Sequence, residues 1–378
     1  MSSSASADFT TPPHPAGTPG DTAPLVPYGW DEEWAAAFAP HAGQGLLPGR
    51  VLRVDRGQCD VVTATGTVRA DTEFVVPRDP MRVVCTGDWC AVDPGGDPRY
   101  VRTLLPRRTA MVRSTSSKRS EGQILAANVD HVIVCVSLAA ELDLGRVERF
   151  LTLAWESGAA PVVALTKSDL VPEPATLAHL VEDVEGAAPG VSVLTVSAAL
   201  GEGTDVLAAI AAGGTSVLIG QSGAGKSTLA NALHGEDAME VHVVRDVDGK
   251  GRHTTTTRNL LVLPGGGVLI DTPGLRGVGL WDAEGGVGQV FAEIEELAER
   301  CRFQDCAHIA EPDCAVLAAA ADGTLPQRRL DSYRKLLREN QYIVAKTDAR
   351  VRAELRREWK SRGAQGRAAQ AAKRGRLR

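Results

Sequence analysis

The chain has 378 residues, of which 43% are apolar and 23% charged, a balance typical of a globular protein with room for two or three domains. No stretch approaches the roughly 18 consecutive apolar residues of a membrane span, so we expect no membrane contact. The N-terminus has neither the basic start nor the apolar centre of a secretory signal. We therefore expect a cytoplasmic protein whose seven cysteines are reduced.

The net charge of −6 is unevenly distributed along the chain. Residues 328–378 contain 17 Lys and Arg against 5 Asp and Glu, a net of +12, which leaves −18 for the rest. A basic end on an acidic body is compatible with binding to nucleic acid or another polyanion. It is equally compatible with a solvated helix followed by a disordered end, and composition does not choose between them.

The chain changes character near residue 45. Residues 1–44 are predicted to be a disordered leader rich in Ser, Pro and Ala, with a candidate short amphipathic helix at 28–38. Residues 45–110 contain short, Val-rich β runs broken by turns, which predict a small closed barrel. A five-stranded oligonucleotide/oligosaccharide-binding (OB) barrel is one candidate, but periodicity does not separate it from other small barrels.

The rest of the chain is predicted to form an α/β domain followed by helices. Residues 111–282 alternate between buried strands and helices, the pattern of a mostly parallel sheet. Ligands of such domains bind at the carboxyl ends of the strands. Residues 283–345 are predicted to be helices around a cysteine cluster, and residues 346–378 a basic tail. The predicted fold class is therefore multi-domain α/β.

A phosphate-binding loop is predicted between a strand and a helix of the α/β domain. Residues 220–227, GQSGAGKS, match G-x-x-x-x-G-K-[ST] at each fixed position. The glycines let backbone N–H groups surround phosphates at the positive end of the helix. Lys226 would pair with the β- and γ-phosphates, and Ser227 would ligate Mg²⁺. The predicted nucleotide-binding residues are Gly220, Gln221, Ser222, Gly223, Ala224, Gly225, Lys226, Ser227 and Thr228.

Two segments after other strands indicate that the base is guanine. Thr166, Lys167 and Asp169 follow the strand PVVAL. The carboxylate would accept hydrogen bonds from the ring N–H and 2-amino group, which adenine cannot offer, while the lysine packs along the base. Ser197 and Ala198 follow VSVLTV and resemble the short loop that contacts guanine. An ATP-dependent phosphotransferase is an alternative, and Asp169 argues against it.

The order of the motifs predicts a circularly permuted GTPase domain. Asp271 and Gly274 follow the strand GVLI, where the carboxylate would hold Mg²⁺ through water and the glycine N–H would sense the γ-phosphate. These residues come last and the guanine motifs first, whereas ordinary GTPases begin with the phosphate loop. Permutation is tolerated because domain termini lie close together. It places the phosphate-sensing segments next to the C-terminal domain, which nucleotide state could then move.

A metal site is predicted in the C-terminal helices. Three cysteines and one histidine, a set that suits a closed tetrahedral Zn²⁺ site, fall within fourteen residues: Cys301, Cys306, His308 and Cys314. No position is left for a catalytic water, so the ion would be structural and would stabilise a small helical domain.

Together, the permuted order, the barrel and the cysteine cluster resemble the bacterial family of circularly permuted, ribosome small-subunit-dependent GTPases. The resemblance covers roughly residues 45–342 and includes LAANVDHV, GQSGAGKST, GRHTTTT and DTPG. It implies an OB barrel, zinc at the cysteine cluster, and GTP hydrolysis activated by the small (30S) subunit late in its maturation. The barrel, zinc domain and basic tail would hold rRNA mainly through phosphates. We expect a monomer.

The residues that promote hydrolysis are inferred from the same resemblance. Many GTPases use a Gln where this chain has Leu275, which cannot orient water. The polar, glycine-rich loop 249–257 is a candidate switch. The resemblance implies that Thr255 senses Mg²⁺, with the threonines on either side of it as alternatives, and that His253 orients water. A nucleotide-gated RNA-binding module with incidental hydrolysis is the alternative function.

One departure from the family concerns the guanine motif. Position 166 is Thr where the family usually has Asn, a side chain that helps to fix the base and the loop. Threonine keeps a hydroxyl, so we expect the guanine preference to survive with weaker binding.

Overall fold

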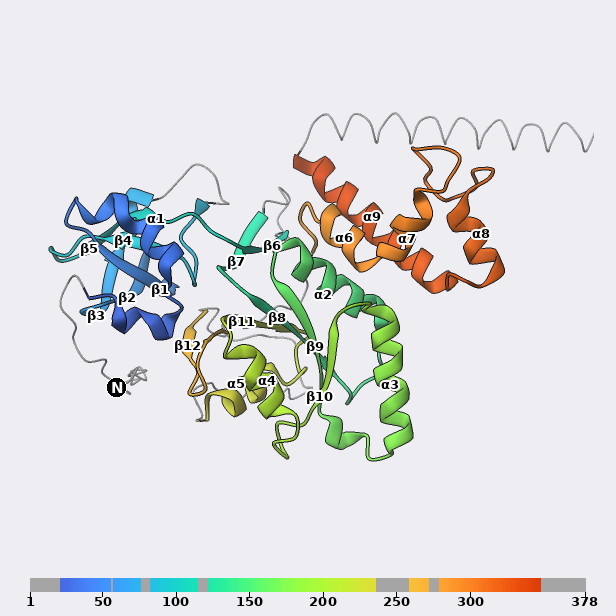
Figure 1. Ribbon diagram of the computed structural model, residues 1–378, viewed down its shortest axis with the longest axis horizontal. Helices are drawn as coiled ribbons and strands as arrows, with labels where there is room; N and C mark the ends of the chain where they lie inside the picture. The colour runs from blue at the N-terminus through green and yellow to red at the C-terminus, as the bar shows by residue number, and fades with distance from the viewer. Residues whose placement is uncertain are drawn as a thin grey trace, which may run out of the picture.

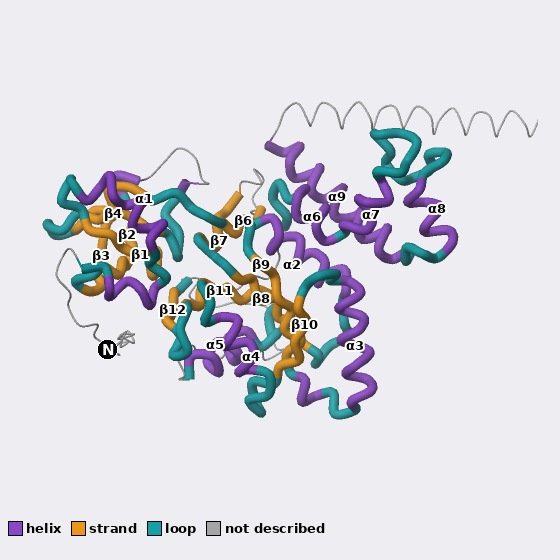
Figure 2. Tube along the Cα trace, in the orientation of Figure 1, coloured by secondary structure: helices purple, strands orange, loops and turns teal. Residues whose placement is uncertain are grey.

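The computed structural model describes residues 21–55, 57–75, 82–114, 122–235, 258–271 and 279–347 (Figures 1 and 2). A small barrel is followed by a helix-covered sheet and then by a group of helices. Residues 1–20 of the expected leader, the loop 249–257 and residues 348–378 of the expected tail lie outside the described residues. Among the helices that the structure describes, none is long and apolar enough to cross a membrane.

The barrel closes in the order β1-β2-β3-β5-β4. Its strands are β1 Leu47–Asp55, β2 Gln58–Thr63, β3 Gly66–Asp71, β4 Trp89–Val92 and β5 Arg99–Leu104, with a short turn of helix, η2, at Glu73–Val75. All pairs are antiparallel except β3 with β5. Every second side chain points inward, as Cys59 and Val61 do on β2. This closed five-stranded barrel fits the predicted OB-type fold.

Two helical segments precede the barrel, where the sequence predicted one short helix. They are η1 Ala23–Tyr28 and α1 Glu32–Ala42. Asp31 caps α1 by accepting a hydrogen bond from the N–H of Trp34 at 2.8 Å. Leu25, Trp34 and Phe38 are buried in the main hydrophobic core. Residues 23–42 therefore belong to the folded protein rather than to a disordered leader.

The α/β domain is built on a six-stranded sheet in the order β10-β9-β8-β11-β13-β12. The strands are β8 His131–Ser137, β9 Ala160–Thr166, β10 Ser192–Val196, β11 Thr215–Gly220, β12 Leu260–Val262 and β13 Val268–Ile270. Only β12 runs antiparallel to its neighbour, which confirms the mostly parallel sheet. A separate hairpin of β6 Ala110–Ser114 and β7 Gly122–Ala127 joins the barrel to this sheet.

Helices cover both faces of the sheet. The helices α2 Leu144–Glu156 and α3 Pro174–Ala187 pack on one face, and α4 Thr204–Ala211 and α5 Lys226–His234 on the other. Strand β8 shows why both faces are apolar: Val132 and Val134 join the core under α2, while Ile133 and Cys135 join the core under α4 and α5. Such two-sided burial explains the continuous apolar run in the sequence.

The C-terminal helices pack against α2 of the α/β domain. They are α6 Glu284–Val290, α7 Ala292–Ala298, α8 Ala315–Asp322 and α9 Gln327–Thr347. Val287, Phe291 and Leu330 are fully buried in the same core as Phe150 and Leu151 of α2. The C-terminal part of the described chain therefore continues the core of the α/β domain.

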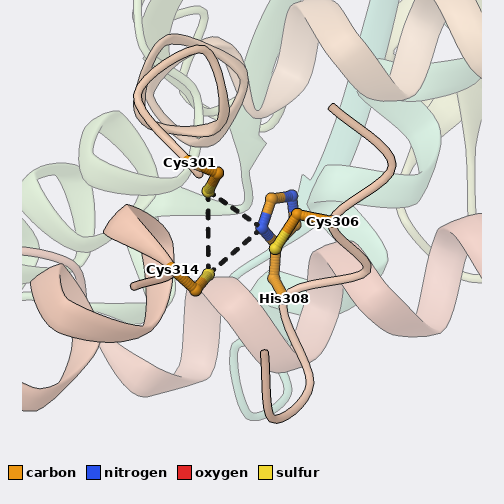
Figure 3. A group of neighbouring side chains, drawn as sticks. All are labelled: Cys301, Cys306, His308 and Cys314. Carbon is orange, nitrogen blue, oxygen red and sulfur yellow. Dashed lines mark hydrogen bonds between the residues drawn. The ribbon is translucent and has the colours of Figure 1, made fainter. Parts of the chain in front are cut away.

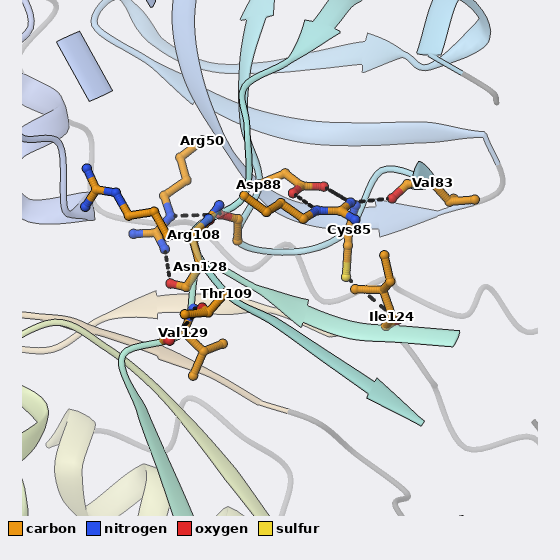
Figure 4. A network of polar contacts seen from close by, with 11 residues as sticks. Arg50, Val83, Cys85, Asp88, Arg108, Thr109, Ile124, Asn128 and Val129 are labelled. Carbon is orange, nitrogen blue, oxygen red and sulfur yellow. Dashed lines mark hydrogen bonds and ion pairs between the residues drawn. The ribbon is translucent and has the colours of Figure 1, made fainter. Parts of the chain in front are cut away.

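A buried arginine joins the barrel to the α/β domain (Figure 4). Arg50 of β1 is 1% exposed, and its guanidinium donates to the carbonyl of Tyr28, to the Gly87 carbonyl at 3.3 Å and to Thr215 Oγ1 at 2.8 Å. Burial lowers the pKa of Arg50 to about 10, against the attraction of Asp130 and Asp88. Because Thr215 begins β11, the barrel is tied directly to the strand that enters the phosphate loop.

Candidate nucleotide site and metal centre

The phosphate loop runs from the carboxyl end of β11 to the first turn of α5. Gly220, Gly223 and Gly225 have φ values of 148°, 80° and 79°, a region that favours glycine. A Cβ on Gly220 would lie 2.4 Å from the carbonyl oxygen of Cys135 on β8. Ala224 is buried, whereas Gln221, Ser222 and Gly223 are exposed. The loop is therefore held in the protein at Gly220 and Ala224, while residues 221–223 remain accessible to a ligand.

Lys226 lies across this loop. Its Nζ donates to the carbonyls of Gly220 at 2.9 Å and Gln221 at 2.7 Å, so the cation is held against the backbone of the loop. Burial lowers the pKa of Lys226, and the attraction of Asp271 opposes the shift. Asp271 follows β13, which pairs with β11, so the predicted Mg²⁺ carboxylate and the loop occupy one sheet edge. Ser227 follows Lys226 in the first turn of α5 and is half-buried.

The two guanine motifs meet at the same edge. Ser197 is fully buried and donates its hydroxyl proton to Asp169 Oδ1 at 2.7 Å. Lys167 has a φ of 61°, unusual for a residue with a side chain, and its Cε lies 4.0 Å from where a Cβ on Gly225 would be. The sharp turn after β9 thus directs the lysine back over the phosphate loop. Such local strain is common where a binding site fixes the backbone.

The structure places most of the predicted nucleotide residues together at the carboxyl ends of β9, β10, β11 and β13. Thr166 ends β9 and Lys167 to Asp169 follow it, Ser197 and Ala198 follow β10, and the phosphate loop begins at the end of β11. Gly274, His253 and Thr255 lie outside the described residues. Carboxyl ends of parallel strands are where α/β domains bind ligands, so the arrangement can hold a nucleotide.

The predicted metal ligands converge in the C-terminal helices (Figure 3). Cys301 Sγ lies 3.6 Å from His308 Nδ1 and 3.7 Å from Cys314 Sγ, and His308 Nδ1 lies 3.4 Å from Cys314 Sγ. The four ligand atoms, including that of Cys306, lie within 4.8 Å of one another. Metal–sulfur bonds of about 2.3 Å in a tetrahedron separate neighbouring ligand atoms by about 3.5–3.8 Å. The cluster is therefore spaced to hold a tetrahedral metal ion.

Neighbouring groups hold the ligands of the cluster in place. Burial lowers the pKa of His308, which keeps its imidazole neutral. Cys314 is the N-cap of α8, and its Sγ accepts a hydrogen bond from the N–H of Leu317 at 3.4 Å, which fixes this ligand at the start of the helix. Arg334 of α9 donates to the carbonyl of His308 and so holds the segment that carries this ligand against α9. The remaining cysteines are Cys59, Cys85, Cys90 and Cys135, all buried and outside the cluster.

Comparisons with known proteins identify the family. A family model described as RsgA GTPase matches residues 104–281. The small ribosomal subunit biogenesis GTPase RsgA of Streptomyces avermitilis is 78% identical over 93% of this chain and 95% of its own length. The protein of the same name from Streptomyces coelicolor is 77% identical over 94% of this chain and 97% of its own length. The chain belongs to the RsgA GTPase family. It is therefore a GTPase, as predicted.

Solved structures of similar proteins confirm the fold. YjeQ from Thermotoga maritima is 25% identical with a TM-score of 0.57, covering 78% of this chain and 98% of its own. YloQ, described as a circularly permuted GTPase, is 24% identical with a TM-score of 0.56, covering 78% of this chain and 95% of its own. The latter similarity supports the fold alone. The predicted permuted order of the motifs is thus an order that a known fold accommodates.

Two contacts at this site were not predicted from the sequence. Ser197 and Asp169 were expected to contact guanine separately, yet the first holds the second. The hydroxyl of Thr166 reaches the phosphate loop at Ala224. A signal existed for both, since each residue ends or follows a strand at the same sheet edge. The pairing itself requires the strand order, which the sequence does not state.

Proposed function

We propose that this protein is a Mg²⁺-dependent GTP hydrolase that binds the small ribosomal subunit and acts as a checkpoint late in its assembly. The observation that supports it most is the Asp169–Ser197 pair beside the phosphate loop, because it holds a carboxylate ready for guanine. The Streptomyces relatives are named as small ribosomal subunit biogenesis GTPases, which supports the small subunit as the partner.

Residue roles follow from chemistry at the sheet edge. Lys226 would pair with the β- and γ-phosphates, and Ser227, Asp271 and Thr255 would hold Mg²⁺, which would offset the phosphate charge. His253 would orient the attacking water. Because Leu275 cannot position water, turnover by the free protein is slow and rises when the subunit binds. On hydrolysis, loss of the γ-phosphate contacts releases the protein from the subunit.

The C-terminal cluster holds one structural zinc ion. Three thiolates and an imidazole are the ligands that Zn²⁺ prefers, and four protein ligands leave no open position for catalysis. The domain boundaries that accompany this proposal are an N-terminal segment at 1–44 that includes the folded helices η1 and α1, the barrel at 45–110, the GTPase domain at 111–282, the zinc domain at 283–345 and the tail at 346–378. Barrel, zinc domain and tail contact rRNA, and the protein acts as a cytoplasmic monomer.

The test is GTP hydrolysis with and without purified small subunits, with large subunits as the control. We expect low turnover alone, no change with large subunits, and a rise of at least about tenfold with small subunits, as for GTPases completed by a partner. Turnover that ignores small subunits would remove the checkpoint role and leave a nucleotide-gated RNA-binding module with incidental hydrolysis.

A further inference from the structure

Thr166 connects two strands that are not neighbours. It ends β9, whereas the phosphate loop follows β11, and β8 lies between them in the sheet. The Thr166 side chain spans this gap: its Oγ1 lies 2.8 Å from the carbonyl oxygen of Ala224 and 3.3 Å from that of Val136 on β8. Ala224 is 2% exposed, so water has little access to this carbonyl. The hydroxyl therefore satisfies a buried acceptor of the phosphate loop.

The hydroxyl has only one proton to donate. Both of its neighbours are carbonyl oxygens, which accept, and the shorter distance assigns the proton to Ala224. The Thr166 residue is 4% exposed, so its hydroxyl points into the protein and not toward the open side of the site. Thr166 therefore has no proton left for the acceptor atoms of guanine, N7 and O6.

Asp169 serves the other edge of the base. It is exposed at the site, and Ser197 holds its Oδ1 at 2.7 Å. A carboxylate accepts hydrogen bonds, so it suits the ring N–H and the 2-amino group and cannot contact N7 favourably. Of these two residues at the end of β9, Thr166 therefore shapes the phosphate loop and Asp169 selects the base.

We propose that Thr166 is a positioning residue that sets the shape of the phosphate loop and takes no part in reading the base. This rests on the GTP-binding part of the proposed function and not on the ribosomal partner. Two consequences follow. Loss of the Thr166 hydroxyl weakens the binding of all nucleotides by the same factor. Because Thr166 does not contact N7 of guanine, 7-deaza-GTP, which has a C–H at that position, binds like GTP.

The test measures the affinities of GDP, GTP, 7-deaza-GTP and ATP on the full chain without ribosomes. Thr166→Val removes the hydroxyl at nearly constant volume, Thr166→Ser keeps it, and Asp169→Asn is the control for base selection. We expect Thr166→Val to lose about five- to tenfold in affinity for every nucleotide, the effect of one buried hydrogen bond. Thr166→Ser should stay within about twofold of the native protein by the same reasoning. The ratio of GTP to 7-deaza-GTP affinity should remain near one in the native protein and in both Thr166 variants.

Thermal unfolding of each variant separates loop shape from general instability. If Thr166→Val melts like Thr166→Ser yet binds more weakly, the positioning role is supported. The proposal is overturned if Thr166→Val binds all nucleotides as tightly as the native protein. It is also overturned if that variant alters the GTP-to-ATP ratio, or if native protein strongly prefers GTP to 7-deaza-GTP. Equal binding of ATP and GTP by the native protein would instead contradict the guanine assignment, so the two failures are distinguishable.

Discussion

Glu148 of α2 and Arg329 of α9 form a buried ion pair, with Oε1 and NH1 2.8 Å apart and side chains 0% and 4% exposed. Arg329 also donates to the carbonyl of Val290 at 2.8 Å and to Glu293 Oε1 at 2.8 Å. The C-terminal helix α9 is therefore fixed to α2 by a charge pair whose arginine makes further hydrogen bonds. Such a pair is costly to break from one side.

We predict that Glu148→Gln destabilises the protein by about 2 kcal/mol, because it removes the buried carboxylate from Arg329 and leaves Glu293, which is 38% exposed, as its charge partner. Glu339→Gln is the matched control: this glutamate pairs with Arg149 between the same two helices, but both side chains are about a quarter exposed, 25% and 26%. Its loss should cost no more than about 1 kcal/mol. Urea denaturation measures both. Equal costs would show that burial of Glu148 does not matter.

Metal removal should affect the C-terminal helices first. We expect about one zinc per chain by elemental analysis, because the cluster supplies four ligands. Cys306→Ser should lose that zinc and speed hydrogen exchange in residues 301–322 more than in the central sheet. Cys85→Ala, a buried cysteine outside the cluster, should keep the metal. A native protein that is stable without any metal would contradict this prediction.

Base selection should depend on Asp169. GTP and GDP should displace a bound fluorescent guanine nucleotide at least about a hundredfold better than ATP. Adenine lacks the ring N–H and the 2-amino group, so it leaves the Asp169 carboxylate without hydrogen-bond donors. Asp169→Asn should remove most of that preference. Asp183→Asn, an exposed carboxylate on α3, should not change it. The assignment fails if native protein binds both bases alike.

The phosphate loop should separate binding from catalysis. Lys226→Ala removes the cation that lies across the loop, so we expect nucleotide binding to fall below detection in the same displacement assay. Ser227→Ala should keep measurable binding but lose Mg²⁺-dependent hydrolysis. If both variants hydrolyse GTP at the native rate, the active site lies elsewhere.

Short-range patterns predicted the parts of this molecule that depend on few residues. The phosphate loop followed from glycine spacing between a strand and a helix, and the metal cluster from four ligands within fourteen residues. Arg50 was not predicted, because an arginine in a Val-rich strand ordinarily faces solvent, whereas here three carbonyls and a hydroxyl surround it. Glu148 and Arg329 are separated by 181 residues, and no local period reports such a pair. Long-range polar contacts require the packing to be known.

The last prediction concerns how nucleotide state reaches the ribosomal subunit. Asp271, at the nucleotide edge, and Glu284, where α6 of the zinc domain begins, are close in sequence. Gly279 lies between these two residues in the sequence, and its carbonyl accepts a hydrogen bond from the backbone N–H of Ser114 in the hairpin at 3.0 Å. We therefore expect the γ-phosphate to change the surface presented near the zinc domain and to raise affinity for the subunit, while GDP lowers it. Thermodynamic linkage then requires the subunit to strengthen GTP binding by the same factor.

Co-sedimentation with small subunits measures this coupling, using a non-hydrolysable GTP analogue, GDP and no nucleotide at two salt concentrations. The analogue should give the tightest binding at both concentrations. Added salt should weaken all three states, because contacts to rRNA phosphates release counterions. A salt effect without a nucleotide effect would show ionic binding that the nucleotide does not control. Indistinguishable affinity with the analogue and with GDP would therefore refute the coupling, even if hydrolysis itself were fully active.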